Sequence, residues 1–597
     1  MKKSTKVDLA HNSEGYFFRA SAEDFLRVPG QPIAYWLSAR SSKNCSDFPL
    51  LATFSDARSG MSSCNSSLFL RQWHEVSHSS INRTAASHEE ASASGRKWFL
   101  YNKGGGNRRW FGYNDVVINW KNDGADIKRF VVSNPKDPDT THWSRRLFNL
   151  EYFFRVGLTW SAVTSGRFSC RSVSIGVIPG TGSKTLYDLS EDSESVIFCL
   201  LNTVVADHYL SVFSPTLNFE AGDVGKLPVN IAIGAGSLRT RDLIDISKRD
   251  WDSFETSLEF SRFPLLLQSD RFASIEGAFQ SLRSHWRQMT QKMQQLEESN
   301  NRIFIDAYGL QDELEPEVLL NEISLTCNPH YRYGGDKSEE ELEAMLLADT
   351  MRELVSYAVG CMLGRYSLDK PGLILANQGE TLADYLAQVS QPSFPADDDN
   401  VIPVLDGDWF ADDITLRFRQ FLRVAFGEEH YDENLTFIEQ ALNVKGKRNY
   451  SLRDYFLGEF YADHVRRYKK RPIYWLFSSP KGSFNALIYM HRYRPDTVSV
   501  VLKYLREYRD KLVDERNRQS AVYINPASSQ GEKTRAQKEV DRLGKILAEL
   551  DDYERDVLYP LATEQKSIDL DDGVKKNYLA FGAALRKIPG LEAKDED

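Results

Sequence analysis

The pattern of apolar and polar positions predicts that the first part of the chain is rich in strands. Residues 1 to about 240 carry short β-branched or aromatic runs, such as 115–120 and 172–178, separated by Gly, Asn and Ser. Such runs indicate strands joined by turns. Residues 193–213 instead have apolar positions at helical spacing and end at Ser214-Pro215, whereas the polar residues 77–95 predict a mobile loop.

A long helix and a helical region are predicted for the rest of the chain. Residues 270–307 predict one helix with a polar middle, suited to a spacer or to packing on one side only. Further helices are predicted at 339–366 and 414–426. Two long charged helices, around 497–521 and 532–558, are separated by a segment with Pro and Gly, which predicts a helical hairpin.

Length and composition are those of a multidomain globular protein. At 597 residues the chain is too long for one core. We predict a mixed α/β fold, with a strand-rich region at 1–240, a long helical spacer and loop at 241–335, and a mainly helical C-terminal region at 336–597. No run approaches the ~18 apolar residues of a membrane span, and the N-terminus lacks the apolar middle of a signal peptide. The six cysteines contain no C-x-x-C pair, so we predict a protein of the reducing cytoplasm.

Residues 96–130 combine cations, aromatic rings, amides and glycines in the mixture that a nucleic-acid surface needs. They hold eight Lys/Arg against three acids, whereas the whole chain has a formal net charge of -10. Lys and Arg attract phosphates, Trp98, Trp110 and Trp120 offer stacking faces, and amides such as Asn107 can read base edges. The alternative is a solvated surface of loops and strands above a few core tryptophans.

A second basic and aromatic block covers residues 464–494. It contains eight Lys/Arg, seven aromatic residues and no acid. The alternative is that residues 473–477 form a buried strand flanked by surface cations, and both interpretations can hold together. The block predicts phosphate contacts.

Motifs for catalysis are weak in this chain. Residues 74–78 match H-E-x-x-H, the zinc pattern of metallopeptidases, but no third ligand follows at the required spacing, so we predict a chance match in a polar loop. Residues 180–185 faintly resemble a phosphate loop and are predicted to form a turn, since the pattern needs Gly where Ser183 stands. Residues 328–331 are the nearest string to the Asn-Pro-Pro-Tyr of amino-methyltransferases and are predicted to lie in a loop. The acid runs 397–399 and 571–572 predict solvated faces.

Nine segments of the chain match a known family in the family's order. They are PGQPIAYWLS (29–38), FLRQWHEV (69–76), KWFLYNKGGGNRRWFG (97–112), LTWSAVTSGRFSCR (158–171), SPTLNFEAGDVGKLPV (214–229), NRIFIDAYGLQDEL (301–314), CNPHYRYGG (327–335), RPIYWLFSSPKGSFNALIYMHRY (471–493) and LDDGVKKNY (570–578). Together they resemble the C-terminal half of PglX, the adenine-specific DNA methyltransferase family of bacterial BREX phage-defence systems.

This resemblance implies a DNA target-recognition region followed by a helical region. In the family, a methyltransferase domain with the cofactor and Asn-Pro-Pro-Tyr motifs lies upstream of the segment resembling 29–38, and only 28 residues precede Pro29 here. We therefore expect the chain to contain no catalytic residues, to bind no cofactor itself, and to need S-adenosylmethionine on a separate methyltransferase domain. The expected partners are double-stranded DNA, a methyltransferase chain and other BREX subunits, without a membrane.

The chain is thus predicted to recognise a short DNA sequence for adenine methylation. There are two alternatives from other functional classes. In these, the chain is either a non-catalytic scaffold of the defence complex or, less favoured, a zinc peptidase. The candidate side chains for base edges are Asn102, Arg108, Arg109, Asn119, Ser165, Arg167 and Arg171, and those for phosphates are Lys97, Lys103, Arg466, Arg467, Lys469, Lys470, Arg471 and Lys481.

Overall fold

The structure, a computed structural model, describes residues 22–267 and 274–592. It is mixed α/β, with several sheets and a helical C-terminal region, which confirms the predicted fold class. One apolar core runs from Val28 to Leu591 and crosses the predicted boundaries at 240 and 335. The N-terminal segment considered for a signal peptide, within 1–21, lies outside the described part of the chain.

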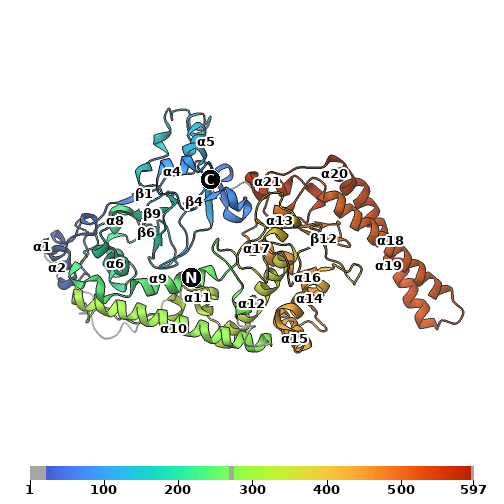
Figure 1. Cartoon of the computed structure of the whole chain (residues 1–597). Helices are drawn as coiled ribbons and strands as arrows, with labels where there is room; N and C mark the ends of the chain where they lie inside the picture. Colours follow the sequence, from blue (N-terminus) through green and yellow to red (C-terminus); the bar gives the residue numbers. More distant parts are fainter. Residues whose placement is uncertain (1–21, 268–273, 593–597) are drawn as a thin grey trace.

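Three sheets organise the strands of the described residues, two in the N-terminal part and one in the C-terminal part (Figure 1). In the first, β4 pairs antiparallel with β5 and parallel with β3 and β8. The first sheet contains β2 (Leu70–Gln72), β5 (Val116–Asn119), β4 (Trp98–Asn102), β3 (Ile81–Asn82) and β8 (Val177–Pro179); the second contains β1 (Ala57–Ser59), β9 (Ser183–Leu186), β6 (Gly157–Ser161) and β7 (Cys170–Val173); the third contains β10 (Ile402–Pro403), β12 (Asn485–Tyr489) and β11 (Tyr474–Ser478).

The run 172–178 forms parts of two strands rather than one. It is divided between β7 and β8, which belong to different sheets. Gly176 lies between them at φ +85°, and a Cβ there would lie 2.4 Å from the carbonyl oxygen of Arg83. The chain therefore turns at the one residue without a side chain and passes from one sheet to the other.

The prediction of a mobile loop at residues 77–95 is wrong. The segment contains β3 and α4 (His88–Ala93), whose N-cap Ser87 accepts a hydrogen bond from the N–H of Glu90. His88 contacts the Asp123 carboxylate (Nδ1 to Oδ1, 2.7 Å) and the Leu150 carbonyl (Nε2 to O, 2.9 Å). Contacts with distant residues thus order a sequence that is too polar to predict structure by itself.

The helical run 193–213 is divided into α6 (Glu191–Leu200) and α7 (Val204–Phe213), which are bent by 76° relative to each other. The predicted end before Ser214-Pro215 is confirmed. Within residues 22–267 and 274–592, no single helix has the length and apolar composition needed to cross a membrane. The bent pair α6 and α7 meets these two criteria only when its helices are taken together. The buried faces of both helices belong to the main core.

The long helix is α10 (Ile275–Tyr308), which lies along the N-terminal part of the molecule (Figure 1). The prediction of one helix is confirmed where the chain is described, since 268–273 are outside that part. Its polar middle is not a solvated spacer, because Glu297, Asn300 and Asn301 are buried. It is followed by α11 (Pro329–Tyr333) and α12 (Glu339–Met362), so the string at 328–331 begins a short helix rather than lying in a loop.

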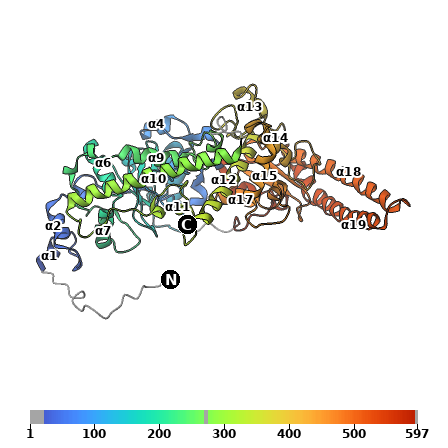
Figure 2. The same cartoon turned by 90° about the horizontal axis from the view of Figure 1, so that it is seen from below.

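The C-terminal region is helical around its small sheet, as predicted. The predicted helix 414–426 is α14 (Ile414–Phe426), and the predicted buried strand is β11. The hairpin is confirmed as α18 (Thr497–Ile524) and α19 (Gln530–Tyr553), which project together from the body (Figures 1 and 2). The other α-helices of the described residues are α1 (Ala22–Leu26), α2 (Ala39–Asp47), α3 (Ser66–Phe69), α5 (Lys121–Val132), α8 (Ala221–Val224), α9 (Thr240–Asp252), α13 (Leu382–Gln388), α15 (Tyr431–Leu442), α16 (Leu452–Gly458), α17 (Phe460–Arg467), α20 (Tyr559–Glu564) and α21 (Gly573–Leu579).

Two acid runs are not simply solvated. Asp397 is buried, and burial, followed by the negative charge of Asp399, raises its pKa to about 7. Asp571 accepts hydrogen bonds from Trp98 Nε1 (2.6 Å) and Lys97 Nζ (2.8 Å). The Asp397 carboxylate is thus withdrawn from solvent, and the Asp571 carboxylate forms a tertiary contact.

Candidate nucleic-acid interface

A glycine-rich loop follows β4 and leaves its two ends exposed. Gly104, Gly105 and Gly106 have φ of +77°, +104° and +70°. A Cβ on Gly104 would lie 2.1 Å from the Gly182 carbonyl oxygen, and one on Gly106 would lie 1.9 Å from the Tyr113 hydroxyl. The loop is therefore pressed against its neighbours in a conformation that only glycine adopts easily, while Lys103 and Asn107 at its ends face solvent.

A second loop lies beside Asn107. A Cβ on Gly166 would lie 2.7 Å from Asn107 Nδ2, and the Tyr331 hydroxyl donates to Asn107 Oδ1 (3.2 Å). Ser165 and Arg167 on this second loop are exposed. We call residues 103–107 and 165–167 the loop edge.

Arg167 is held at the loop edge by two carboxylates. It forms ion pairs with Asp207 (Nε to Oδ2, 3.2 Å) and Glu322 (Nη1 to Oε2, 2.6 Å), and its side chain remains 43% exposed. Burial raises the pKa of Asp207 to about 6, although Arg167 lowers it. This arrangement orients a guanidinium toward solvent beside an exposed amide, a combination that can read base edges.

Lys103 also lines a cavity of about 310 Å³ between the first sheet and the C-terminal region. The cavity brings together cations from both predicted basic blocks and from two other segments, with the carboxylates of Glu75 and Asp572. We call this cavity the basic pocket. Its five cations are Arg71 on β2, Lys103 after β4, Lys469 and Arg471 after α17, and Lys575 on α21.

The chain reaches the basic pocket from α17 through an unusual turn. Lys469 and Lys470 adopt φ of +51° and +61° in succession, a left-handed conformation that costs free energy for residues other than glycine. Lys469 forms an ion pair with Asp115 of the first basic block. Such strain is often found at functional sites, and here it points two adjacent lysines outward.

Residues 74–76 of the H-E-x-x-H segment are buried beside this pocket, and the segment forms turns packed on the fold rather than a polar loop. Glu75 Oε2 accepts the Gln72 N–H (2.8 Å), and Glu75 Oε1 accepts the Val574 N–H (2.9 Å). His74 and His78 lie in two separate 3-10 turns instead of one helix face. Burial, followed by the charge of Arg83, lowers the pKa of His78 to about 4. In the described part of the chain, no group of three or more His, Cys, Asp or Glu could hold a metal ion.

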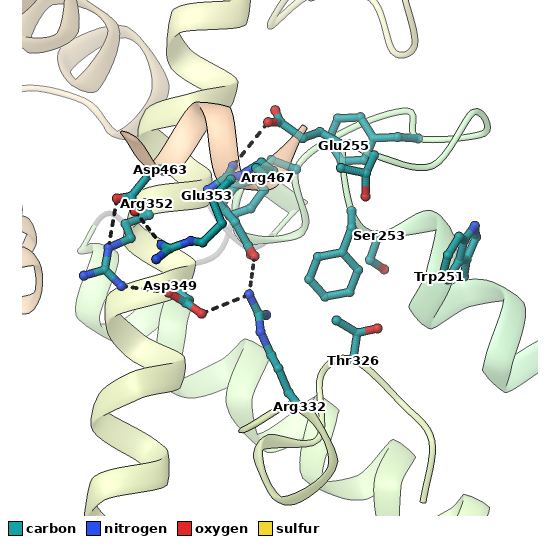
Figure 3. A pocket seen from close by; sticks show the side chains of 15 residues that line it. Trp251, Ser253, Glu255, Thr326, Arg332, Asp349, Arg352, Glu353, Asp463 and Arg467 are labelled. Atoms are coloured by element: carbon teal, nitrogen blue, oxygen red, sulfur yellow. Dashed lines mark hydrogen bonds and ion pairs between the residues drawn. The ribbon is translucent and has the colours of Figure 1, made fainter. Parts of the chain in front are cut away.

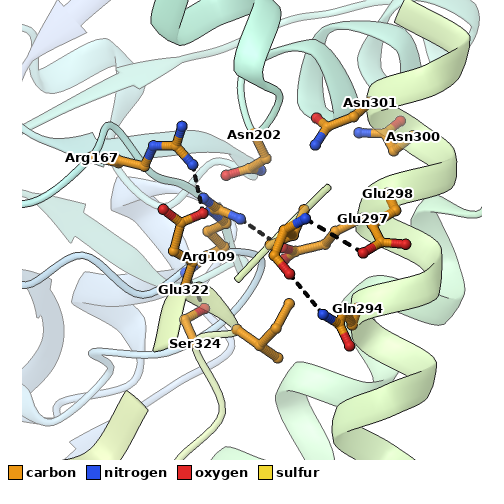
Figure 4. A network of polar contacts seen from close by, with 12 residues as sticks. Arg109, Arg167, Asn202, Gln294, Glu297, Glu298, Asn300, Asn301, Glu322 and Ser324 are labelled. Carbon is orange, nitrogen blue, oxygen red and sulfur yellow. Dashed lines mark hydrogen bonds and ion pairs between the residues drawn. The ribbon is translucent and has the colours of Figure 1, made fainter. Parts of the chain in front are cut away.

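Two arginines of the first block form buried ion pairs. Arg108 is 2% exposed and bonds to Asp250 (Nη2 to Oδ2, 2.7 Å). Arg109 bonds to Glu297 on α10 (Nη1 to Oε2, 2.6 Å), as Figure 4 shows. Glu297 also accepts the Trp110 Nε1–H (2.7 Å). Both arginines fasten the loop between β4 and β5 to the helices behind it.

Other candidates of this block also have interior partners. Asn102 donates to Thr159 Oγ1 (2.8 Å), Asn119 donates to Asp126 (3.1 Å), and the Arg171 guanidinium lies 4.9 Å from the Tyr113 ring centroid. Trp98, Trp110 and Trp120 are buried, in agreement with the alternative of core tryptophans. Lys97 is half-buried in its ion pair with Asp571. Because these side chains are buried or half-buried against partners within the protein, they are less accessible to a ligand than the exposed cations Lys103, Arg167 and Lys469.

The candidates of the second block lie in different places. Arg466 is exposed and forms an ion pair with Asp463 (2.5 Å), whereas Arg467 is largely covered and bonds to Glu255 (3.2 Å). Lys470 is exposed near Gly590. Lys481 lies apart, and its backbone N–H donates to Glu549 of α19 (2.7 Å).

Sequence reasoning missed Arg71 and Lys575 as members of the basic pocket. Arg71 has neutral residues on both sides, and Lys575 is followed by one lysine and lies shortly after two aspartates. Neither residue therefore lies in a local cluster of positive charge. Both lie within segments that resemble the PglX family, FLRQWHEV and LDDGVKKNY, and that resemblance was the available signal.

Comparison with known proteins gives two similar sequences, and no family model matches the chain. The adenine-specific methyltransferase BrxX of Escherichia coli O9:H4 (strain HS) is 35% identical over 597 residues, and the adenine-specific methyltransferase PglX of Lacticaseibacillus casei (strain Zhang) is 35% identical over 595 residues. Each alignment covers 97% of this chain but only 47% or 46% of the relative. The chain therefore spans about half the length of the curated relatives it matches.

Proposed function

We propose that this chain is the sequence-specific DNA-recognition part of a BREX-type adenine-specific DNA methyltransferase. The observation that supports this most is the convergence of both basic blocks on the basic pocket, next to the loop edge. A basic concavity beside exposed amide and guanidinium groups has the two components of DNA recognition, which are phosphate attraction and base reading.

The two parts of this interface have different roles in the proposal. Lys103, Lys469 and Lys575 neutralise phosphates and set the register of the duplex. Asn107, Ser165 and Arg167 then read base edges, since amides and guanidinium groups form specific hydrogen bonds there. The burial of Arg108 and Arg109 gives them the separate role of keeping this edge rigid.

Methyl transfer itself belongs to a methyltransferase domain in this proposal. Such a domain supplies S-adenosylmethionine and the pocket that receives the adenine. The role of this chain is to hold the DNA in register for that domain. Other subunits of the defence system are the proposed protein partners.

The test compares two pairs of lysine substitutions in the salt dependence of binding to duplex DNA. A plot of log affinity against log salt has a negative slope, and removal of one lysine–phosphate interaction reduces its magnitude by about 0.9. The pair Lys103→Gln with Lys469→Gln should therefore reduce the magnitude by up to about 1.8. The control pair is Lys503→Gln with Lys538→Gln on the hairpin, where both lysines are exposed. Equal slopes in the two pairs would contradict the proposed phosphate contacts.

Base reading requires a separate measurement. Arg167→Ala should cost about 1–3 kcal/mol at one base position and leave binding to unrelated sequences nearly unchanged. A binding selection from randomised duplexes, performed on the parent and on this variant, measures that difference. Identical base preferences in both would exclude Arg167 from base reading.

A scaffold role is the second candidate, and one feature favours it. The hairpin α18–α19 projects from the body (Figure 2), and Tyr523 and Ile524 at its tip are 45% and 74% exposed. Exposed apolar side chains on a projecting arm are typical of protein contacts. Full DNA affinity without the hairpin tip, combined with loss of complex assembly, would assign the arm to partners.

A further inference from the structure

A second cavity, of about 300 Å³, lies where the N-terminal part meets α12 and α17 (Figure 3). Its lining includes Trp251 at the end of α9, Phe254, Arg332 of α11, Glu353 of α12 and Arg467 of α17. A concave site of this size, in which several charged side chains lie among aromatic ones, can hold a small organic ligand that has both flat and hydrogen-bonding surfaces.

The charges of this cavity cancel. Arg332 bonds to Asp349 (3.2 Å) and Glu353 (2.8 Å), and Arg467 bonds to Glu255 (3.2 Å); Figure 3 shows these pairs around the cavity. The complete charged lining is four arginines, Arg332, Arg352, Arg466 and Arg467, and four carboxylates, Glu255, Asp349, Glu353 and Asp463. A balanced lining gives a phosphate no net attraction, unlike the basic pocket, and therefore favours a neutral ligand.

The walls favour a planar ligand with hydrogen-bonding edges. Phe254 and Trp251 provide aromatic surface, and the Arg332 guanidinium lies 5.5 Å from the Phe254 ring centroid. Aromatic rings and guanidinium planes stack on heterocycles. Carboxylates accept from ring N–H and amino groups, while guanidinium groups donate to ring nitrogens and carbonyls. We propose that this cavity binds a single nucleobase.

The cavity is next to the loop edge. Tyr331, which donates to Asn107, immediately precedes Arg332 in α11. The Trp251 ring lies 5.6 Å from the Tyr113 ring, and Tyr113 in turn contacts the glycine-rich loop. If the chain binds DNA as proposed above, the ligand is a base that has left the stack of a duplex held at the loop edge. This application to DNA rests on the proposed function.

Free nucleosides test the cavity without DNA. Adenosine, guanosine, cytidine and thymidine are titrated separately into the whole chain, with calorimetry and tryptophan fluorescence as readouts. At least one should bind saturably at one site, and Phe254→Leu or Glu353→Gln should weaken it about 5-fold or more. The matched control is Glu343→Gln on the same helix, which pairs with Arg283 outside the cavity; it should leave nucleoside affinity unchanged. Thermal unfolding of each variant verifies that it is folded.

A duplex with one unpaired 5-iodouracil opposite an abasic site tests delivery of a base. Photocrosslinks mapped to Trp251 or Phe254 would support the inference. If the chain binds this duplex but crosslinks elsewhere and binds no nucleoside, the inference is overturned while the proposed function stands. If a nucleoside binds in the cavity but the duplex does not bind at all, the proposed function fails and the cavity is a nucleoside site.

Discussion

Substitutions in the buried ion pair Arg109–Glu297 test whether Arg109, an arginine of the first basic block, stabilises the fold or binds DNA. Glu297 is 2% exposed and accepts hydrogen bonds from Arg109 (2.6 Å) and Trp110 (2.7 Å). Arg109→Met leaves this carboxylate buried without its cation, near the further negative charges of Asp207 and Glu322. Breaking a buried pair on one side typically costs about 3–5 kcal/mol.

A double-mutant cycle isolates the pair. Glu297→Gln alone should also cost about 3 kcal/mol or more, because it leaves the Arg109 charge buried without its nearest carboxylate. The double variant Arg109→Met with Glu297→Gln removes both charges of the pair, and its amide oxygen still accepts from Trp110. Only the amide NH₂ has no partner there, at a cost of about 1–3 kcal/mol, so the double variant should be more stable than either single variant.

The free energy of unfolding is measured by urea titration with circular dichroism and tryptophan fluorescence. In parallel, the salt slope of DNA binding is measured for each folded variant. A cost below about 1 kcal/mol for Arg109→Met, together with a salt slope lowered by about 0.9, would refute the reasoning. It would mean that Arg109 leaves its buried position to contact a phosphate.

Three other predictions follow from single positions. The folded pKa of Asp397, about 7, is raised by burial and then by a neighbouring carboxylate, so its contribution to stability is full at acidic pH and is lost as pH rises from about 4 through 7. Urea titration at pH 5 and pH 8 should therefore show that Asp397→Asn removes at most about 3 kcal/mol of the stability lost between these two pH values. Gly104→Ala should cost more than about 1 kcal/mol because of its φ of +77° and a close carbonyl, whereas Gly222→Ala, with open space around it, should not; equal losses would contradict this. Metal analysis should find zinc well below one per chain, and the same amount after His78→Ala; one zinc per chain, lost in that variant and in His74→Ala, would restore the peptidase alternative.

The sequence by itself determined the elements that depend on local periodicity. The helix at 414–426, the long helix α10 and the hairpin α18–α19 were all predictable. In each, apolar positions recur at helical spacing over several turns, and Pro or Gly marks the breaks. The resemblance to a methyltransferase family was also available from segments of the sequence, and similarity over 97% of the chain agrees with it.

Only tertiary contacts decided the structure of the short or polar segments. Residues 172–178 look like one strand, but β7 pairs with its neighbour β6, whereas β8 pairs with β4, which lies 77 residues earlier in the chain. Residues 77–95 look unstructured, but His88 is held by Asp123 and by the Leu150 carbonyl. Local propensity cannot reveal a partner that approaches from another part of the fold.

The candidate interface shows the same division. Composition locates two basic blocks, because charge is a property of each residue. Exposure is a property of packing: Arg108 is neutralised by Asp250, 142 residues away, whereas Lys103 faces the same cavity as Lys469. Burying a cation is costly unless a carboxylate pairs with it, so the carboxylates that fold against each block decided which of its cations are buried and which stay exposed.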